Sequence, residues 1–331
     1  MGNQNCHAEI TFDDNVKWIA RFRLARTSSP PREGTCIPTP EIFDWACESD
    51  PGNPLGVDYI LMEKLDGKPL DWQAATPRQK EKIIQQLIDM FLEIEKHPFE
   101  AMGSLFSSAG DAIEIQGLVH QSTWQVGKGP LGPFSSLLEG SQAMLESYLR
   151  MIASGEIDPC YPVETYIVHR FRQDIVGSLS ENILPDNQFF LKHPDDKGDH
   201  ILVNDRFDIV GVIDWEWTRT VSSAEAFCSP CMMWPVNEFY DGSNQLAAIF
   251  QERGRADLAN YVLKGRKVQR FFFALGPESS FIDMQTLPRL FAGLQEAFNV
   301  KSEEWETWKS KALVKWKDDE LLLGLLEESS H

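Results

Sequence analysis

The sequence is poor in positive charge. It has 31 Lys and Arg residues against 50 Asp and Glu residues, and its formal net charge is −19 at pH 7. Nucleic acids and anionic membranes are bound through basic patches, so we expect neither as a partner. The same charge allows a cationic small molecule, although an acidic balance also serves solubility.

The sequence also lacks the segments that direct a chain to a membrane. No apolar run approaches the ~18 residues that span a bilayer. The first residues, MGNQNCHAEI, have no basic-then-apolar signal pattern. The six cysteines include one close pair, Cys228 and Cys231, without a second pair or nearby histidines to complete a zinc site. These absences favour a cytoplasmic protein with reduced thiols.

Regular patterns are present along most of the 331 residues. Alternating polar and apolar residues predict a hairpin over residues 6–24 and two more strands over 41–47 and 57–65. An amphipathic pattern predicts a helix over 76–99. From about residue 220 the chain is predicted to be helical, and its last part carries Trp305, Trp308 and Trp316 at a spacing typical of residues that pack into a core.

This order predicts an α+β chain with two unlike lobes. We expect a small, shortened β-rich lobe at 1–63 and a larger helical lobe at 64–331. Such lobes commonly place a ligand cleft at their junction. Within the helical lobe, three short strands are predicted over 189–193, 200–204 and 209–215.

These short strands carry carboxylates and imidazoles in an ordered spacing. Asp195 follows the first strand, His200 begins the second and Asp214 ends the third. A hairpin over 200–214 brings its far end back beside its beginning, so we expect the three side chains to face one small volume. Such a group has the parts that phosphoryl transfer needs, namely metal ligands and a base for a hydroxyl.

The same segment resembles the aminoglycoside phosphotransferase family, which has a protein-kinase-like fold. The family has a loop of the form H-G-D-x-x-x-x-N-I-L-V followed by I-I-D-W, and this chain has HPDDKGDHILV at 193–203 and VIDW at 212–215. YILMEKLDGKPL at 59–70 resembles the family's interlobe connection, whose backbone contacts adenine. CMMWPVNEFYDGSN and GRKVQRFFFALG, further along the chain, resemble the fungal branch.

The resemblance implies an ATP-dependent kinase that phosphorylates a hydroxyl of an aminoglycoside-like molecule or other small metabolite. It implies Asp195 as the catalytic base, and Asp214 and His200 as ligands of Mg²⁺, with Mn²⁺ as an alternative. His193 would be a structural member of the loop. The implied nucleotide-binding residues are Arg21, Arg23, Met62, Glu63, Lys64 and Lys197; Lys17 shares a strand face with Arg21 and Arg23, and Lys197 also fits a solvated loop.

The sequence departs from the family pattern at several points. His200 replaces an asparagine, and imidazole is a poorer Mg²⁺ ligand than an amide oxygen. Arg21 replaces a lysine, and the chain begins where the family has its glycine-rich loop. Residues 25–40, which include Glu33, are predicted as a loop where the family has a helix with a glutamate.

These departures keep two alternatives open. One is a kinase-like pseudoenzyme that binds a ligand or partner without turnover. The other is a non-haem metal enzyme that uses His193, Asp195 and His200, although this alternative leaves Asp214 unexplained.

Overall fold

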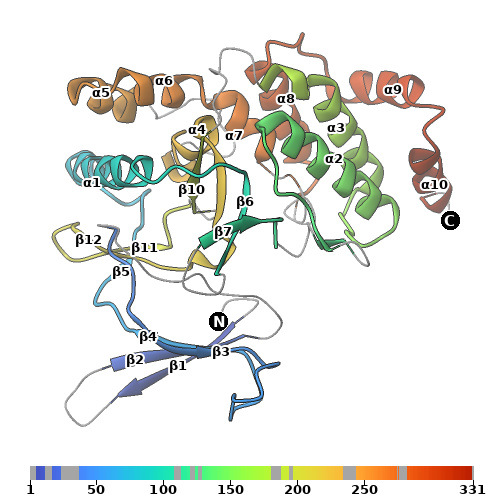
Figure 1. Cartoon of the computed structure of the whole chain (residues 1–331). Helices are drawn as coiled ribbons and strands as arrows, with labels where there is room; N and C mark the ends of the chain where they lie inside the picture. The colour runs from blue at the N-terminus through green and yellow to red at the C-terminus, as the bar shows by residue number, and fades with distance from the viewer. Residues whose placement is uncertain are drawn as a thin grey trace. The chain divides into compact units, whose positions relative to one another are not determined.

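Figure 1 shows the computed structural model of the chain, which forms two compact units. The first unit comprises Met1–Lys96, Ser107–Ala112 and His193–Thr218, and the second comprises His97–Phe106, Ile113–Lys192 and Arg219–His331. The structure describes residues 5–11, 17–23, 37–107, 113–119, 124–125, 129–179, 188–193, 197–233, 244–273, 275 and 282–329.

A four-stranded antiparallel sheet begins the first unit. Its strands are β1 (Asn5–Thr11), β2 (Lys17–Arg23), β3 (Ile42–Ala46) and β4 (Tyr59–Glu63), in the order β1-β2-β4-β3. These strands confirm the predicted hairpin and the two strands that follow it. The predicted loop at 25–40 lies largely outside the described residues.

A second sheet and one long helix complete the first unit. The sheet has the order β12-β11-β5, with β5 (Lys68–Pro69), β11 (Ile201–Val203) and β12 (Ile209–Val212). The helix is α1 (Pro77–Glu95). Thr76 caps its start, since its hydroxyl accepts from the backbone of Gln79 while the Gln79 side chain accepts from the backbone of Thr76. The predicted helix and the predicted strands at 200–204 and 209–215 are therefore confirmed.

The second unit contains another antiparallel sheet, with the order β10-β13-β6-β7. Its strands are β6 (Gly103–Ser107), β7 (Ile113–Gln116), β10 (Phe189–Lys192) and β13 (Arg219–Ser222), and the pair β8 (Trp124–Gln125) and β9 (Gly129–Pro130) lies apart from it. Only β10 was predicted from the sequence. The expectation of helices from about residue 220 is wrong at β13, because this strand pairs with segments far away in the chain.

Helices form the rest of the second unit (Figure 1). They are α2 (Leu137–Ala153), α3 (Pro162–Ile175), α4 (Ser223–Ala226), α5 (Asn244–Glu252), α6 (Ala256–Lys264), α7 (Arg266–Phe272), α8 (Leu287–Ala297), α9 (Trp305–Lys315) and α10 (Glu320–Glu328). Among the described residues, no helix is both long and apolar enough to cross a bilayer.

Aromatic side chains connect α3, α8 and α9 in the core of the second unit. Phe291 of α8 lies with its ring centroid 4.0 Å from that of Trp308 and 5.0 Å from that of Phe171. Trp305, Trp308 and Trp316 are all buried. The prediction that the three tryptophans pack into a core is confirmed.

Truncation of this cluster should therefore be costly. We expect Trp308→Ala to lower the free energy of unfolding by about 3–5 kcal/mol, because it removes a buried ring and leaves a cavity. Urea unfolding followed by circular dichroism measures the change. Val314→Ala on the same helix is the control, since Val314 is 70% exposed and should change stability by about 0.5 kcal/mol or less. Equal stability losses in the two variants would contradict this packing.

A buried histidine in α3 should make stability depend on pH. Burial, helped by the nearby Arg172 guanidinium, lowers the pKa of His169 from 6.5 to about 3. Protons then bind the unfolded chain more tightly than the folded one, so stability falls as pH decreases from about 6.5 towards 3. Between these two pH values, His169 should lower the free energy of unfolding by about 1.4 kcal/mol for each unit by which the pH falls. We expect the stability difference between wild type and His169→Gln to change with this slope in urea unfolding from pH 7 to pH 5, and parallel curves would refute the prediction.

Candidate active site

The hairpin of β11 and β12 positions the two predicted metal ligands. Ile201 pairs with Val212, and one residue further out the N–H of Ile213 donates to the carbonyl oxygen of His200 at 2.9 Å. Ile213 is thus the partner of His200, and Asp214 follows Ile213 directly. The prediction that the hairpin returns Asp214 to the neighbourhood of His200 is confirmed.

Asp214 has an unusual backbone conformation at the end of this hairpin. Its φ and ψ are 70° and 42°, in the left-handed region, and its side chain is exposed. L-residues enter this region at a cost of roughly 1–2 kcal/mol. A short 3₁₀ turn, Trp215–Trp217, follows it, and the indole N–H of Trp215 donates to the carbonyl oxygen of Val212 at 2.9 Å. The backbone of Asp214 is thus strained just after the strand ends, and strained residues of this kind cluster at functional sites.

Two histidines stack behind this strand end. The rings of His193 and His200 have centroids 4.2 Å apart and planes 16° apart. His193 Nε2 lies 2.9 Å from the carbonyl oxygen of Ile213. A carbonyl only accepts, so Nε2 carries the proton and donates. Trp215 closes the other side, with its ring 5.0 Å from that of His193 in an edge arrangement.

These contacts limit how His200 can meet a metal ion. Its side chain is 8% exposed, and its Nδ1 atom is buried. The described residues hold no cluster of three His, Cys, Asp or Glu side chains with metal-binding geometry. Asp214 and His200 therefore fit a divalent cation only together with further ligands.

Several predicted site residues lie wholly or partly outside the described parts. Asp195 and its neighbour Asp196 fall in the gap at 194–196. The backbones of Arg21 and Arg23 belong to β2, where Arg21 pairs with Ile60 of β4. The assignments of Asp195, Arg21 and Arg23 stay predictions.

Lys197 is described, and it lies on the surface. Its ammonium nitrogen is 4.0 Å from a carboxylate oxygen of Asp199, and both side chains are more than 60% exposed. An exposed pair of this kind contributes little to stability. A role for Lys197 in nucleotide binding stays a prediction.

The predicted adenine-binding residues lie at the end of β4. The N–H of Glu63 donates to the carbonyl oxygen of Glu41 at 2.7 Å, and the Glu63 carboxylate accepts from the N–H of Glu41 at 3.1 Å. A nucleotide contact by Glu63 would therefore use its carbonyl oxygen. Met62 belongs to the same strand and Lys64 follows it, and their nucleotide contacts stay predictions.

The connector after β4 lies directly on the hairpin. Its N–H at Leu70 donates to the carbonyl oxygen of Ile201 at 2.8 Å. A Cβ atom on Gly67 would come within 2.7 Å of Val210, and one on Gly211 within 2.4 Å of Leu65. A side chain at either position would have to push these neighbours aside. The connector and the candidate metal ligands thus belong to one packed group within the first unit.

Comparison with known sequences gives a short match. No family model matches the chain. Two subtelomeric hrmA-associated cluster proteins from strains of Aspergillus fumigatus are 36% identical over 72 residues, which cover 21% of this chain and 14% of each relative. The chain thus matches about a seventh of the length of these curated relatives.

Comparison with solved structures identifies the fold. A thermostable mutant of aminoglycoside phosphotransferase APH(4)-Ia, in ternary complex with ADP and hygromycin B, has a TM-score of 0.51 at 10% identity and covers 92% of this chain and 93% of its own. A protein assigned as a fructosamine-3-kinase from Thermobifida fusca has a TM-score of 0.53 at 14% identity, with 91% and 92% covered.

The chain therefore has an α+β, protein-kinase-like fold of the aminoglycoside phosphotransferase type. This confirms the fold that the loop at 193–203 predicted. The likeness to a fungal branch stays a prediction.

The strain at Asp214 gives a test that separates its backbone from its carboxylate. We expect Asp214→Gly to be more stable than Asp214→Ala by roughly 1 kcal/mol, because glycine enters the left-handed region freely. Chemical denaturation measures the difference. The same pair at Asp199, Asp199→Gly and Asp199→Ala, is the control. A more stable alanine variant at 214 would show that the left-handed conformation is not retained.

Proposed function

We propose that this protein is an ATP-dependent phosphotransferase that moves the γ-phosphoryl group to a hydroxyl of a small molecule. The observation that carries the proposal is the hairpin, which sets His200 and Asp214 side by side in a chain with the fold of small-molecule kinases. A phosphoryl-transfer site works by positioning the two reactants and by stabilising the charge of the transition state.

The chain's residues divide the reaction between them. Asp195 accepts the proton of the acceptor hydroxyl, whose oxygen then forms a bond to the γ-phosphorus. The bond from that phosphorus to the bridging oxygen breaks, and ADP leaves. Asp214 and His200 hold a divalent cation, Mg²⁺ or Mn²⁺, which supplies charge neutralisation at the phosphates.

In this proposal the N-terminal lobe holds the nucleotide. Arg21 and Arg23 of β2 contact phosphates, with Lys197 as a further cation. The β4 end and connector, Met62, Glu63 and Lys64, contact the adenine. We assign residues 1–63 to the nucleotide-side lobe and 64–331 to the catalytic and substrate lobe.

The acceptor belongs to the aminoglycoside-like molecules or other small metabolites with a free hydroxyl. Support comes from the structural neighbour that binds hygromycin B. The net charge of −19 favours a cationic acceptor, because the field of the whole protein attracts positive ligands.

His200 supports a second candidate function, a kinase-like protein that binds without turnover. Its ring is stacked on His193 and largely buried, and this environment is less suited to Mg²⁺ than an exposed amide oxygen. The third alternative, a non-haem metal enzyme that uses His193, Asp195 and His200, gives Asp214 no role.

Nucleotide binding and transfer test the proposal in sequence. Millimolar ATP with Mg²⁺ or Mn²⁺ should raise the melting temperature in a thermal-shift titration, and nucleotide at 100 times its Kd should add about 2.7 kcal/mol of stability. Asp195→Ala should keep this shift and lose transfer to a hydroxyl acceptor by roughly 10²–10⁴-fold. Asp214→Ala should remove the dependence of the shift on metal.

Asp205→Ala is the matched control, because Asp205 is an exposed carboxylate in the turn at the far end of the same hairpin. It should leave both binding and transfer unchanged. Binding without any transfer in the wild type would favour the pseudoenzyme, and no shift with either metal would refute the kinase.

A further inference from the structure

The turn between β11 and β12 is ordered by its own side chains. Asn204 Oδ1 accepts from the N–H of Arg206 at 2.9 Å and from that of Asp208 at 3.0 Å. Phe207 has a φ of 60°, in the left-handed region. The turn therefore has a defined shape, at the opposite end of the hairpin from Asp214.

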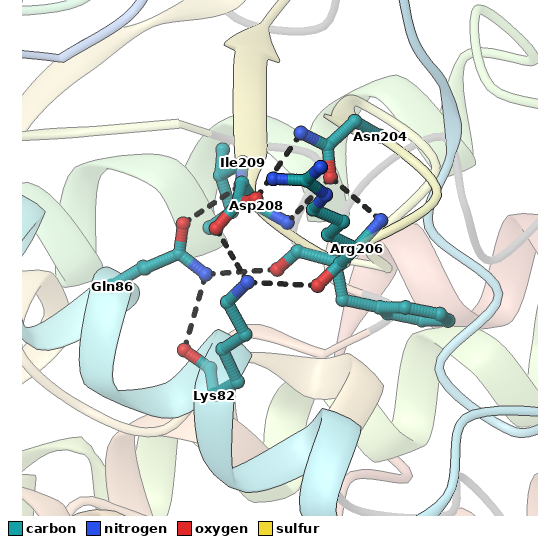
Figure 2. Close-up of polar contacts among 7 residues, drawn as sticks. Lys82, Gln86, Asn204, Arg206, Asp208 and Ile209 are labelled. Atoms are coloured by element: carbon teal, nitrogen blue, oxygen red, sulfur yellow. Dashed lines mark hydrogen bonds and ion pairs between the residues drawn. The ribbon is translucent and has the colours of Figure 1, made fainter.

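Gln86 of α1 binds this turn through both ends of its amide (Figure 2). Its Oε1 accepts from the N–H of Ile209 at 2.8 Å, and its Nε2 donates to the carbonyl oxygen of Phe207 at 3.0 Å. One side chain thus bonds the backbone on both sides of Asp208. This is the pattern that a neighbouring strand would make, with a donor and an acceptor two residues apart.

Lys82 makes a second contact one helical turn earlier on the same face of α1 (Figure 2). Its ammonium group donates to the carbonyl oxygen of Arg206 at 2.8 Å and lies 2.5 Å from the carboxylate of Asp208. The hydrogen bond from Lys82 lowers the pKa of Asp208, helped by the one from Asn204. The helix thus contacts three successive residues of the turn and the first residue of β12.

The register of β12 explains why these contacts matter. Leu202 pairs with Gly211, but Val203 pairs with Ile209, so Val210 is an extra residue in β12. β11 is only three residues long, and the extra residue disrupts the ladder locally, so few strand hydrogen bonds oppose a shift of β12. Loss of this extra residue with Val203 still opposite Ile209 would shift the rest of β12, and Asp214 after it, by one position.

We propose that Gln86, assisted by Lys82, is a positioning residue that fixes the register of β12 and thereby sets Asp214 beside His200. By holding Ile209, Gln86 fixes the place of the extra residue, Val210, in β12. The chemical consequence, a correctly placed metal ligand, rests on the proposed function. The structural consequence, a single register for β12, does not rest on the proposed function.

Native-state hydrogen exchange on the full chain without nucleotide tests the structural part. In Gln86→Met the amide of Ile213, which donates to His200, should exchange roughly tenfold faster, because two hydrogen bonds that hold the register are lost. Gln251→Met is the matched control, since Gln251 is exposed on α5. An Ile213 rate equal to that of the control overturns the proposal.

Lys82 provides a second variant in case Gln86→Met does not fold. Lys82→Met should also accelerate exchange at Ile213, and Lys82→Arg, which keeps the charge and the donors, should restore the wild-type rate. Glu81→Gln, at an exposed neighbour on α1, should have no effect. Failure of arginine to restore the rate would show that Lys82 does not act through these contacts.

Metal binding tests the chemical part. In Gln86→Met the Mn²⁺ concentration that gives half of the ATP-dependent thermal shift should rise roughly tenfold, because the hydrogen bonds that hold the register of β12, and with it Asp214, are lost. A wild type without any ATP shift would refute the proposed function and leave the exchange result standing. A normal ATP shift with unchanged exchange and unchanged Mn²⁺ dependence would refute the positioning role alone.

Discussion

The candidate site depends on the two backbone groups of Ile213. Its N–H donates to the carbonyl oxygen of His200, and its own carbonyl oxygen accepts from the His193 side chain. Ile213, which follows β12 and precedes Asp214, therefore contacts both histidines. Backbone hydrogen bonds are short and directional, so the geometry of this corner follows from the pairing of β11 with β12. The ring stacking of the two histidines is a consequence of this pairing.

The pairing is supported from the other side by the connector. β5 forms the third strand of the same sheet, with Leu202 opposite Pro69. The absence of a side chain at Gly67 and at Gly211 leaves room for the side chains of Val210 and Leu65, respectively. The end of the connector, β5, and the hairpin with the predicted metal ligands are thus distant in the chain but belong to one sheet.

Local patterns could be predicted from the sequence, and distant pairings could not. The helix at α1 and the hairpin of β11 and β12 are encoded by periodicity and turn residues that lie within a few positions. β13 was missed because its partners are remote. The Thr220 hydroxyl, for example, accepts from the N–H of Gly103, 117 residues earlier, and donates to Ala101.

The candidate site shows the same limit. The motif spacing predicted that Asp214 returns to His200, since that depends only on hairpin length. It gave no sign of the left-handed conformation at Asp214, because nothing in the side chain requires it. Gln86 was also missed, since a glutamine on a helix surface resembles any solvated residue until its partners at 207 and 209 are placed.

If Asp214 and His200 hold the metal ion, as proposed, the residue at position 200 bears on which metal they prefer. An asparagine would offer an amide oxygen, which is a hard ligand that Mg²⁺ prefers. His200 offers a ring nitrogen instead. Carboxylate oxygens suit both Mg²⁺ and Mn²⁺, whereas imidazole favours the later transition metals. In the proposed site, a histidine in place of an asparagine therefore makes Mg²⁺ a less suitable ion, without any change in the hairpin that holds residues 200 and 214.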